Sequence, residues 1–143
     1  MKKFILLLTI STYLLSCVPI LIPVPREKRK TCYSIWSVRN CTDADLTLTV
    51  FEQNLSLPKG EEREIHHDFK EVHSIEKNDP DLFRTILSAG KVSVYSENTL
   101  LKTWENDKSD ERNFFNQSAW LYEFEKPYTH RWTFEINPED IGL

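Results

Sequence analysis

The chain contains few glycines, and this shortage excludes several enzyme classes. Only Gly60, Gly90 and Gly142 are present among 143 residues. Phosphate-binding loops and dinucleotide-binding turns need closely spaced glycines, because their backbone must approach the ligand. A Gly-x-Ser-x-Gly hydrolase motif and a Cys-x-x-Cys metal or redox pair are also missing from the sequence. We therefore expect a protein that is not an enzyme and needs no cofactor.

Basic residues are outnumbered, 18 lysines and arginines against 22 acidic residues. Nucleic-acid binding needs a basic surface that neutralises phosphates, so the charge balance predicts no nucleic-acid partner. Residues 26–30, Arg-Glu-Lys-Arg-Lys, form the one basic cluster. A solvated spacer is the favoured interpretation of this cluster. The alternative is a contact with anionic lipid headgroups, where each charge contributes about 1 kcal/mol.

The first seventeen residues carry the clearest signal. Lys2 and Lys3 precede an apolar stretch at residues 4–15, and Leu-Leu-Ser-Cys at residues 14–17 matches a lipobox. The stretch resembles bacterial lipoprotein signal peptides, which implies cleavage before Cys17 and a lipid on its sulfur. The alternative is a transmembrane helix, since apolar residues continue to position 24. Three prolines, at positions 19, 23 and 25, would interrupt the hydrogen bonds of such a helix.

This division predicts a signal peptide at residues 1–16, a lipidated cysteine and tether at 17–31, and one domain at 32–143. Loss of the signal peptide leaves 16 basic residues against 22 acidic ones, a formal charge of −6. The remaining length suits one hydrophobic core, because two domains would each be too small. The lipid anchor at Cys17 predicts a stable membrane association.

Seven segments have the β-branched and aromatic composition of strands: 33–38, 46–51, 62–66, 91–97, 100–105, 120–125 and 129–136. Turn-forming residues at 39–45 predict a hairpin between the first two segments. One helix is expected over residues 79–90, because Asp79 can cap it and Gly90 can end it. The pattern predicts a mainly β protein, an antiparallel β-sandwich of about seven strands with one short helix.

The outline, including the ending Thr-Phe-Glu-Ile-Asn-Pro-Glu-Asp-Ile, resembles the small lipoproteins abundant in Bacteroidales. The resemblance lies in the signal, the first hairpin and the closing aromatic strand, and it brings no catalytic motif. In that group, acidic residues soon after the lipidated cysteine are linked to surface export, and residues 18–25 contain none. The resemblance therefore implies an outer-membrane lipoprotein that faces the periplasm.

Two cysteines, Cys32 and Cys41, lie inside the expected domain. An exported protein favours a disulfide. However, the strand predicted between them would separate them by about 30 Å, whereas a disulfide needs Cα atoms only about 4 to 7 Å apart. The sequence therefore favours two buried or half-buried thiols over a disulfide.

Two groups of polar residues are candidate metal sites. His66, His67 and His73 are the best nitrogen ligands, but neighbouring residues of a strand point to opposite faces, so these side chains do not converge. An exposed loop is the favoured interpretation. The oxygen ligands of the polar stretch 106–112 lack the glycine and the distal glutamate of a calcium loop, which favours a solvated loop.

The last two strands carry aromatic residues on one face: Trp120, Tyr122, Phe124, His130, Trp132 and Phe134. A simple turn at 126–128 places Tyr122 opposite Trp132, and Glu123 opposite Arg131 on the other face. One face must be buried, so the aromatic face is predicted to be core rather than a platform for glycan rings. The less constrained candidates for a ligand-facing ring are Trp36 and Trp104, together with Trp120.

The leading hypothesis is a non-catalytic envelope lipoprotein that binds or assembles with another envelope protein. Function would then lie on exposed loops, notably 39–45 and 106–112. A glycan-binding lipoprotein with exposed tryptophans and a periplasmic inhibitor or immunity protein are the alternatives.

Overall fold

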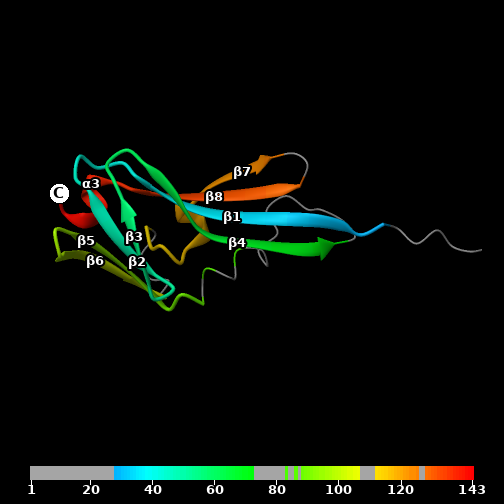
Figure 1. Cartoon of the computed structure of the whole chain (residues 1–143), viewed down its shortest axis with the longest axis horizontal. Helices are drawn as coiled ribbons and strands as arrows, with labels where there is room; N and C mark the ends of the chain where they lie inside the picture. The colour runs from blue at the N-terminus through cyan, green and yellow to red at the C-terminus, as the bar shows by residue number, and fades with distance from the viewer. Residues whose placement is uncertain (1–27, 73–82, 84–85, 87, 107–111, 126–127) are drawn as a thin grey trace, which may run out of the picture.

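The computed structural model describes residues 28–72, 83, 86, 88–106, 112–125 and 128–143, whose strands form two sheets of four (Figure 1). The first sheet has the order β4-β1-β8-β7 and the second β3-β2-β5-β6. The strands are β1 (Lys30–Asn40), β2 (Leu46–Val50), β3 (Gln53–Leu57), β4 (Glu62–Val72), β5 (Lys91–Ser96), β6 (Thr99–Glu105), β7 (Leu121–Glu125) and β8 (Thr129–Ile136). The predicted mainly β sandwich is confirmed, with eight strands.

The strand that sequence reasoning missed is β3. It follows β2 after only two residues, Phe51 and Glu52, which both have positive φ, 49° and 61°. Two-residue hairpin turns of this type usually contain asparagine or glycine. Phe51 and Glu52 give no such signal, so the turn and the strand after it went unpredicted.

The expected hairpin between the first two strands is wrong. β1 pairs with β4 and β8 in the first sheet, whereas β2 pairs with β3 and β5 in the second. Residues 41–45 therefore cross between the sheets. Furthermore, β1 and β8 run parallel, so the sandwich is not purely antiparallel.

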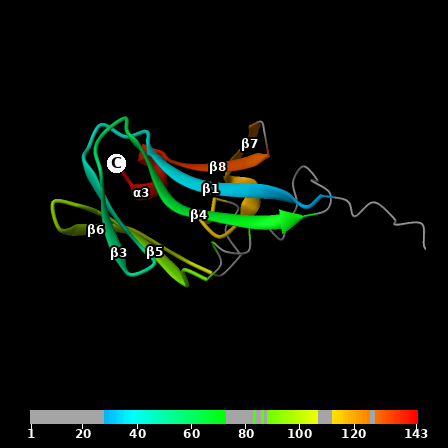
Figure 2. The same cartoon turned by 45° about the vertical axis from the view of Figure 1, so that its right-hand side comes forward.

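The charged edge strand expected at 62–66 is present as β4, which is longer and runs to Val72. It pairs only with β1 among the described strands. The register shifts so that Trp36 faces His66 while Ser37 faces Glu64, which leaves Ile65 as a bulge. Figures 1 and 2 show that β1 and β4 extend well beyond the second sheet, toward the end where β1 begins.

The closing hairpin has the predicted register. Tyr122 lies opposite Trp132, and Glu123 lies opposite Arg131. Trp132 and Phe134 are fully buried, and Glu123 is exposed. The aromatic face of this hairpin is therefore core, as alternation predicted.

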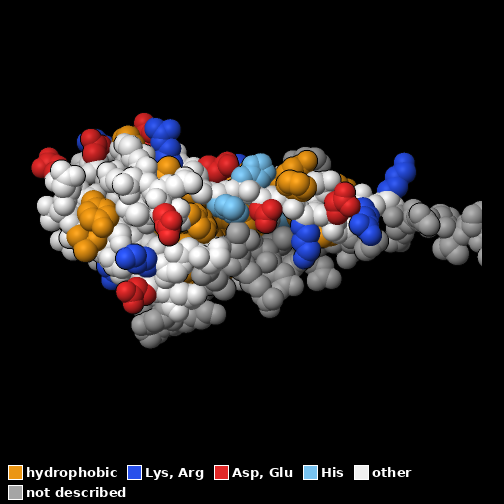
Figure 3. All heavy atoms as spheres, turned by 60° about the horizontal axis from the view of Figure 1, so that its bottom comes forward, with side chains coloured by type: hydrophobic (Ala, Val, Ile, Leu, Met, Phe, Trp, Pro, Cys, Tyr) orange, Lys and Arg blue, Asp and Glu red, His pale blue; other side chains and the backbone are white. Residues whose placement is uncertain are grey.

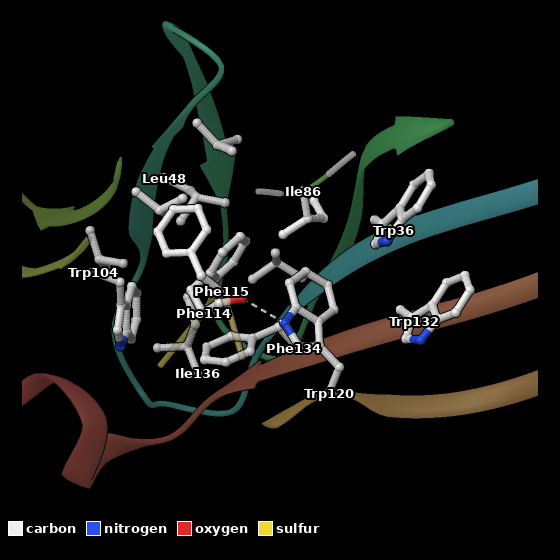
Figure 4. Close-up of a cluster of buried hydrophobic side chains, with 14 of the residues drawn as sticks. Trp36, Leu48, Ile86, Trp104, Phe114, Phe115, Trp120, Trp132, Phe134 and Ile136 are labelled. Atoms are coloured by element: carbon white, nitrogen blue, oxygen red, sulfur yellow. Dashed lines mark hydrogen bonds between the residues drawn. The ribbon is translucent and has the colours of Figure 1, made fainter. Parts of the chain in front are cut away.

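The core is rich in aromatic rings (Figure 4). Trp36, Trp104 and Trp120 are 0%, 2% and 5% exposed, so none of these candidate ligand-facing rings lies at the surface, and Trp120 belongs to the core as the alternation of the closing hairpin predicted. The segment between β6 and β7 adds Phe114 and Phe115, and the indole nitrogen of Trp120 donates to the Phe114 carbonyl oxygen at 2.7 Å. Burial of the rings between two sheets removes far more apolar area from water than a rim position would.

Helical structure is sparse in the described part of the chain. Phe83 and Ile86 are helical and buried, and the rest of the helix expected over 79–90 lies outside the described residues, apart from the turn at 88–90. Two short helices were not predicted, the 3-10 turn η1 (Gln117–Ala119) and α3 (Pro138–Ile141).

Candidate binding surfaces

The outer face of the second sheet is polar and largely uncharged. Thr47 lies opposite Ser56, and Thr49 lies between Asn54 and Ser93. The Thr49 hydroxyl donates to the Asn54 side-chain oxygen at 2.7 Å. The hydroxyls of Ser93 and Thr103 lie 3.0 Å apart, so one donates to the other. These bonds hold the side chains in a fixed array of donors and acceptors.

A shallow hollow of about 340 Å³ lies on this face. It is lined by Thr47, Thr49, Asn54, Tyr95 and Asn98, with no charged residue among them. Ligand pockets for small molecules are mostly apolar. This hollow instead offers hydroxyl and amide groups, which suits a partner that brings its own polar groups.

The edge strands β4 and β3 of the two sheets differ in how well they are protected against pairing with another strand. β4 carries several charged side chains and a bulge, the devices that prevent unwanted strand pairing. The sequence of β3, Gln-Asn-Leu-Ser-Leu, contains no charge and no proline, and its register with β2 is regular. Among the described strands β3 pairs only with β2. Its other edge is an uncharged row of backbone groups.

The outer face of the first sheet is tied together by ion pairs. Arg39 lies between Glu62 at 2.8 Å and Glu135 at 3.0 Å. The hydrogen bond that Arg39 donates to Glu62 is the main reason that the pKa of Arg39 is raised, and the charge of both carboxylates adds to it. Arg131 similarly donates to Glu125 at 2.8 Å, which raises the pKa of Arg131 and lowers that of Glu125. These guanidinium groups are occupied by structural partners.

The histidine set does not assemble. His66 packs against the rings of Trp36 and Phe51 at 5.3 and 5.4 Å. His67 instead contacts the ring of Tyr33 at 6.0 Å, on the opposite face of β4. His73 lies outside the described residues. Within the described ranges, no group of three side chains is placed to hold a metal ion.

The two cysteines of the domain lie at opposite ends of β1. Cys32 is buried, Cys41 is exposed, and the strand between them is continuous, so they do not bond to each other. This confirms the predicted separation of the thiols. The prediction that both thiols are buried or half-buried is wrong for Cys41, which follows the end of β1 and is exposed. Partial desolvation of this thiol is the main cause that raises its pKa, and the charge of Glu135 adds to it.

In the loop at 39–45, Asn40 has a structural role. The buried Asn40 side chain donates to the carbonyl oxygens of Ala44 at 2.7 Å and Leu57 at 3.0 Å, and it accepts from the Thr42 amide at 2.9 Å. It thereby fixes the crossing between the sheets. In the second loop that the sequence singled out, residues 107–111 and thus Asp107 lie outside the described residues, as does Cys17.

No protein-family model, curated protein or solved structure matches the chain. A search of the described residues finds no helix with the length and apolar character needed to cross a membrane. The candidate surfaces must therefore be judged from their own chemistry.

Proposed function

We propose that this protein is a membrane-anchored envelope lipoprotein that binds a protein partner without catalysis. The observation that carries the proposal is the uncharged edge of β3 beside the polar outer face of the second sheet. Strand addition to an exposed sheet edge is a common mode of protein recognition, in which backbone hydrogen bonds give affinity and neighbouring pockets give specificity.

The geometry of the β2–β3 hairpin identifies the groups available to a partner. Val50 and Gln53 close a two-residue turn, so they form a hydrogen-bonded pair. The pairs then alternate, and the amide and carbonyl groups of Asn54 and Ser56 point away from β2. The side chains of Asn54 and Ser56 are both exposed. A partner strand would meet two sets of backbone groups with little obstruction.

The anchor comes from the sequence. The Leu-Leu-Ser-Cys lipobox supports lipidation of Cys17, and the absence of acidic residues at 18–25 supports an outer-membrane position that faces the periplasm. A protein held at a membrane needs only a rigid surface to recruit a partner. An inhibitor or immunity protein would be one form of such a module.

The edge of β3 is tested by site-specific photocrosslinking in intact cells. A crosslinker at Asn54 should give one discrete adduct, and Ser56→Pro should abolish it, because proline removes an outward amide hydrogen without breaking the ladder to β2. A crosslinker at Glu123 on β7 serves as the control position. An adduct that persists in a folded Ser56→Pro protein would contradict strand addition.

The anchor is tested by fractionation. Cys17→Ser should leave the chain unprocessed or released from the membrane, whereas the unaltered chain should carry a lipid-modified Cys17 detectable by mass spectrometry. A processed Cys17→Ser protein that stays in the membrane fraction would contradict the anchor.

Glycan binding is the weaker candidate. The three tryptophans that were candidates for stacking on sugar rings are buried, and Tyr95 is the one aromatic residue that lines the hollow. Loss of oligosaccharide binding on Tyr95→Ala, with the β3 adduct unchanged, would favour it over the protein partner.

A further inference from the structure

Three exposed aromatic rings gather at the end of the first sheet where β1 begins. Tyr33, Phe69 and Tyr128 are 41%, 68% and 37% exposed. Tyr33 and Phe69 are cross-strand partners of β1 and β4, and the Tyr33 amide donates to the Tyr128 carbonyl oxygen at 2.9 Å. The three residues therefore lie at the same end of the sheet, with Tyr33 and Phe69 side by side on its outer face. Among the described residues, the other large exposed apolar side chains are those of Leu100, Leu121 and Leu143.

Basic side chains lie at the same end of the sheet, where the register places Lys30 beside Val72 and Lys70 beside Cys32, on the face opposite to Tyr33 and Phe69. Lys28, Arg29, Lys30 and Lys70 are exposed, and the Lys30 ammonium lies 5.4 Å from the centre of the Tyr128 ring. Glu71 is 3.4 Å from Arg29. Counting Asp68 and Glu71 as the acidic residues of this end, its formal charge is +2, against −4 for the whole chain. Figure 3 shows hydrophobic and basic side chains together with acidic ones over β4 toward this end.

The same end is the one nearest to Cys17 along the chain. Ten residues lie between Cys17 and Lys28, and a fully extended chain from one to the other spans at most about 40 Å. A lipid on Cys17 would thus keep the start of β1 close to the bilayer. The C-terminus and α3 lie at the opposite end of the molecule (Figure 1).

We propose that this end of the first sheet, which carries the rings of Tyr33, Phe69 and Tyr128 and the basic side chains on both faces, is a docking surface that meets end-on a bilayer with anionic headgroups. Aromatic rings with polar tips favour the interface between water and lipid, and lysine and arginine are attracted to anionic headgroups. The tether raises the effective concentration of the surface at the membrane, so weak contacts suffice to orient the domain. The inference rests on the proposed lipid anchor.

This docking fixes which surfaces remain accessible. The first sheet projects toward the bilayer beyond the second sheet (Figures 1 and 2). The second sheet, with its β3 edge and polar hollow, then faces the compartment. The domain would present its binding surface in one orientation instead of tumbling on its tether.

The test uses the lipidated chain in two kinds of vesicles, one zwitterionic and one about one-third anionic, followed by hydroxyl-radical footprinting. Labelling of Tyr33, Phe69 and Tyr128 should fall about threefold or more in the anionic vesicles. Leu100 and Leu143 should be labelled equally in both. Lys28→Glu with Lys70→Glu should restore labelling of the three rings, whereas Lys59→Glu with Lys91→Glu, the same charge change elsewhere on the surface, should not.

Equal labelling of the three rings in both vesicle types would overturn the docking surface, while a chain that still floats with the vesicles would leave the anchor intact. If the chain carries no lipid and stays in solution, both the anchor and the docking surface are overturned. Flotation and the mass of the peptide that contains Cys17 separate these two results.

Discussion

At the scale of single residues, the domain is organised by its tryptophans. Trp36 and Trp132 stack across the parallel β1–β8 pair, with ring centres 5.6 Å apart and planes inclined by 12°. Both are fully buried, and among the described residues neither indole nitrogen has a hydrogen-bond partner. An unpaired buried donor costs about 1–3 kcal/mol. Burial of a large ring, about 200 Å² at about 25 cal/mol per Å², contributes about 5 kcal/mol, so packing dominates.

Replacement of Trp132 should therefore be severe. Trp132→Ala is expected to lower the free energy of unfolding by about 3–5 kcal/mol, because it leaves a cavity beside Trp36. Arg131 is the neighbouring residue, and its side chain lies on the outer face of the sheet. Arg131→Ala removes a partly exposed ion pair and should lower the free energy of unfolding by under about 1 kcal/mol. Urea unfolding measures both. Similar losses for the two variants would contradict the burial of the aromatic face.

The two thiols should differ in reactivity. Cys32 should react with a maleimide only after denaturation, because it is buried. Cys41 should react in the native protein, but more slowly at neutral pH than a free thiol does, because its pKa is raised and less of it is thiolate below that pKa. Mass spectrometry of timed reactions measures both. Protection of both cysteines after denaturation without reductant would show that they form disulfides.

At the scale of elements, two hairpins have turn residues whose backbone adopts the left-handed conformation, with positive φ. Phe51 and Glu52 have positive φ in the β2–β3 turn, and Glu97 and Asn98 have positive φ in the β5–β6 turn. Such a conformation costs an ordinary side chain about 1–2 kcal/mol. The Phe51 ring offsets part of this cost by packing 5.4 Å from the His66 ring, which joins the turn to the first sheet.

Relief of this strain should stabilise the domain. Glu52→Gly is expected to raise the free energy of unfolding by about 0.5–1 kcal/mol, the strain released minus the extra freedom that glycine gives the unfolded chain. Glu52→Ala keeps the strain and serves as the control, with little expected change. Thermal unfolding compares the two, and an equal effect of both substitutions would refute the strain argument.

Sequence patterns predicted elements where local chemistry decides the structure. Alternation and a three-residue turn were sufficient for the register of β7 with β8. No sequence pattern indicated that β3 begins after β2, because Phe51 and Glu52 are not typical turn residues. The sequence also did not indicate which distant strands pair. The turn-forming residues at 39–45 are compatible with a hairpin as well as with a crossing between sheets. The crossing is stabilised by the buried Asn40 side chain, which donates to the carbonyl oxygens of Ala44 and Leu57. The candidate surface at the β3 edge was missed for the same reasons.

At the scale of the whole molecule, Arg112 ties the segment before η1 to the C-terminus. Its guanidinium donates to the Asp140 carboxylate at 2.7 and 3.2 Å and to the Glu135 carbonyl oxygen at 2.9 Å. The Asp140 side chain is only 6% exposed. The hydrogen bond that Arg112 donates to Asp140 is the main reason that the pKa of Arg112 is raised. This pair connects parts of the chain that no strand ladder joins.

Loss of that connection should be measurable. Arg112→Ala is expected to cost about 1.5–3 kcal/mol, because it leaves a nearly buried carboxylate without its charged donor. Arg63→Ala is the matched control, since Arg63 bonds Glu61 at 2.6 Å on the exposed surface, where such pairs contribute under about 1 kcal/mol. Chemical denaturation should separate the two variants, and equal costs would contradict a role for burial.

The place of β8 in the first sheet has a consequence for how the chain is made. β8 is the last strand in the sequence, yet it lies between β1 and β7, and the ion pair of Arg39 with Glu135 joins residues 96 positions apart. During synthesis β1 emerges early and has no partner on that side until almost the whole chain exists. Folding that depends on such distant pairings is slow. The domain should therefore close only after its final strand has been synthesised.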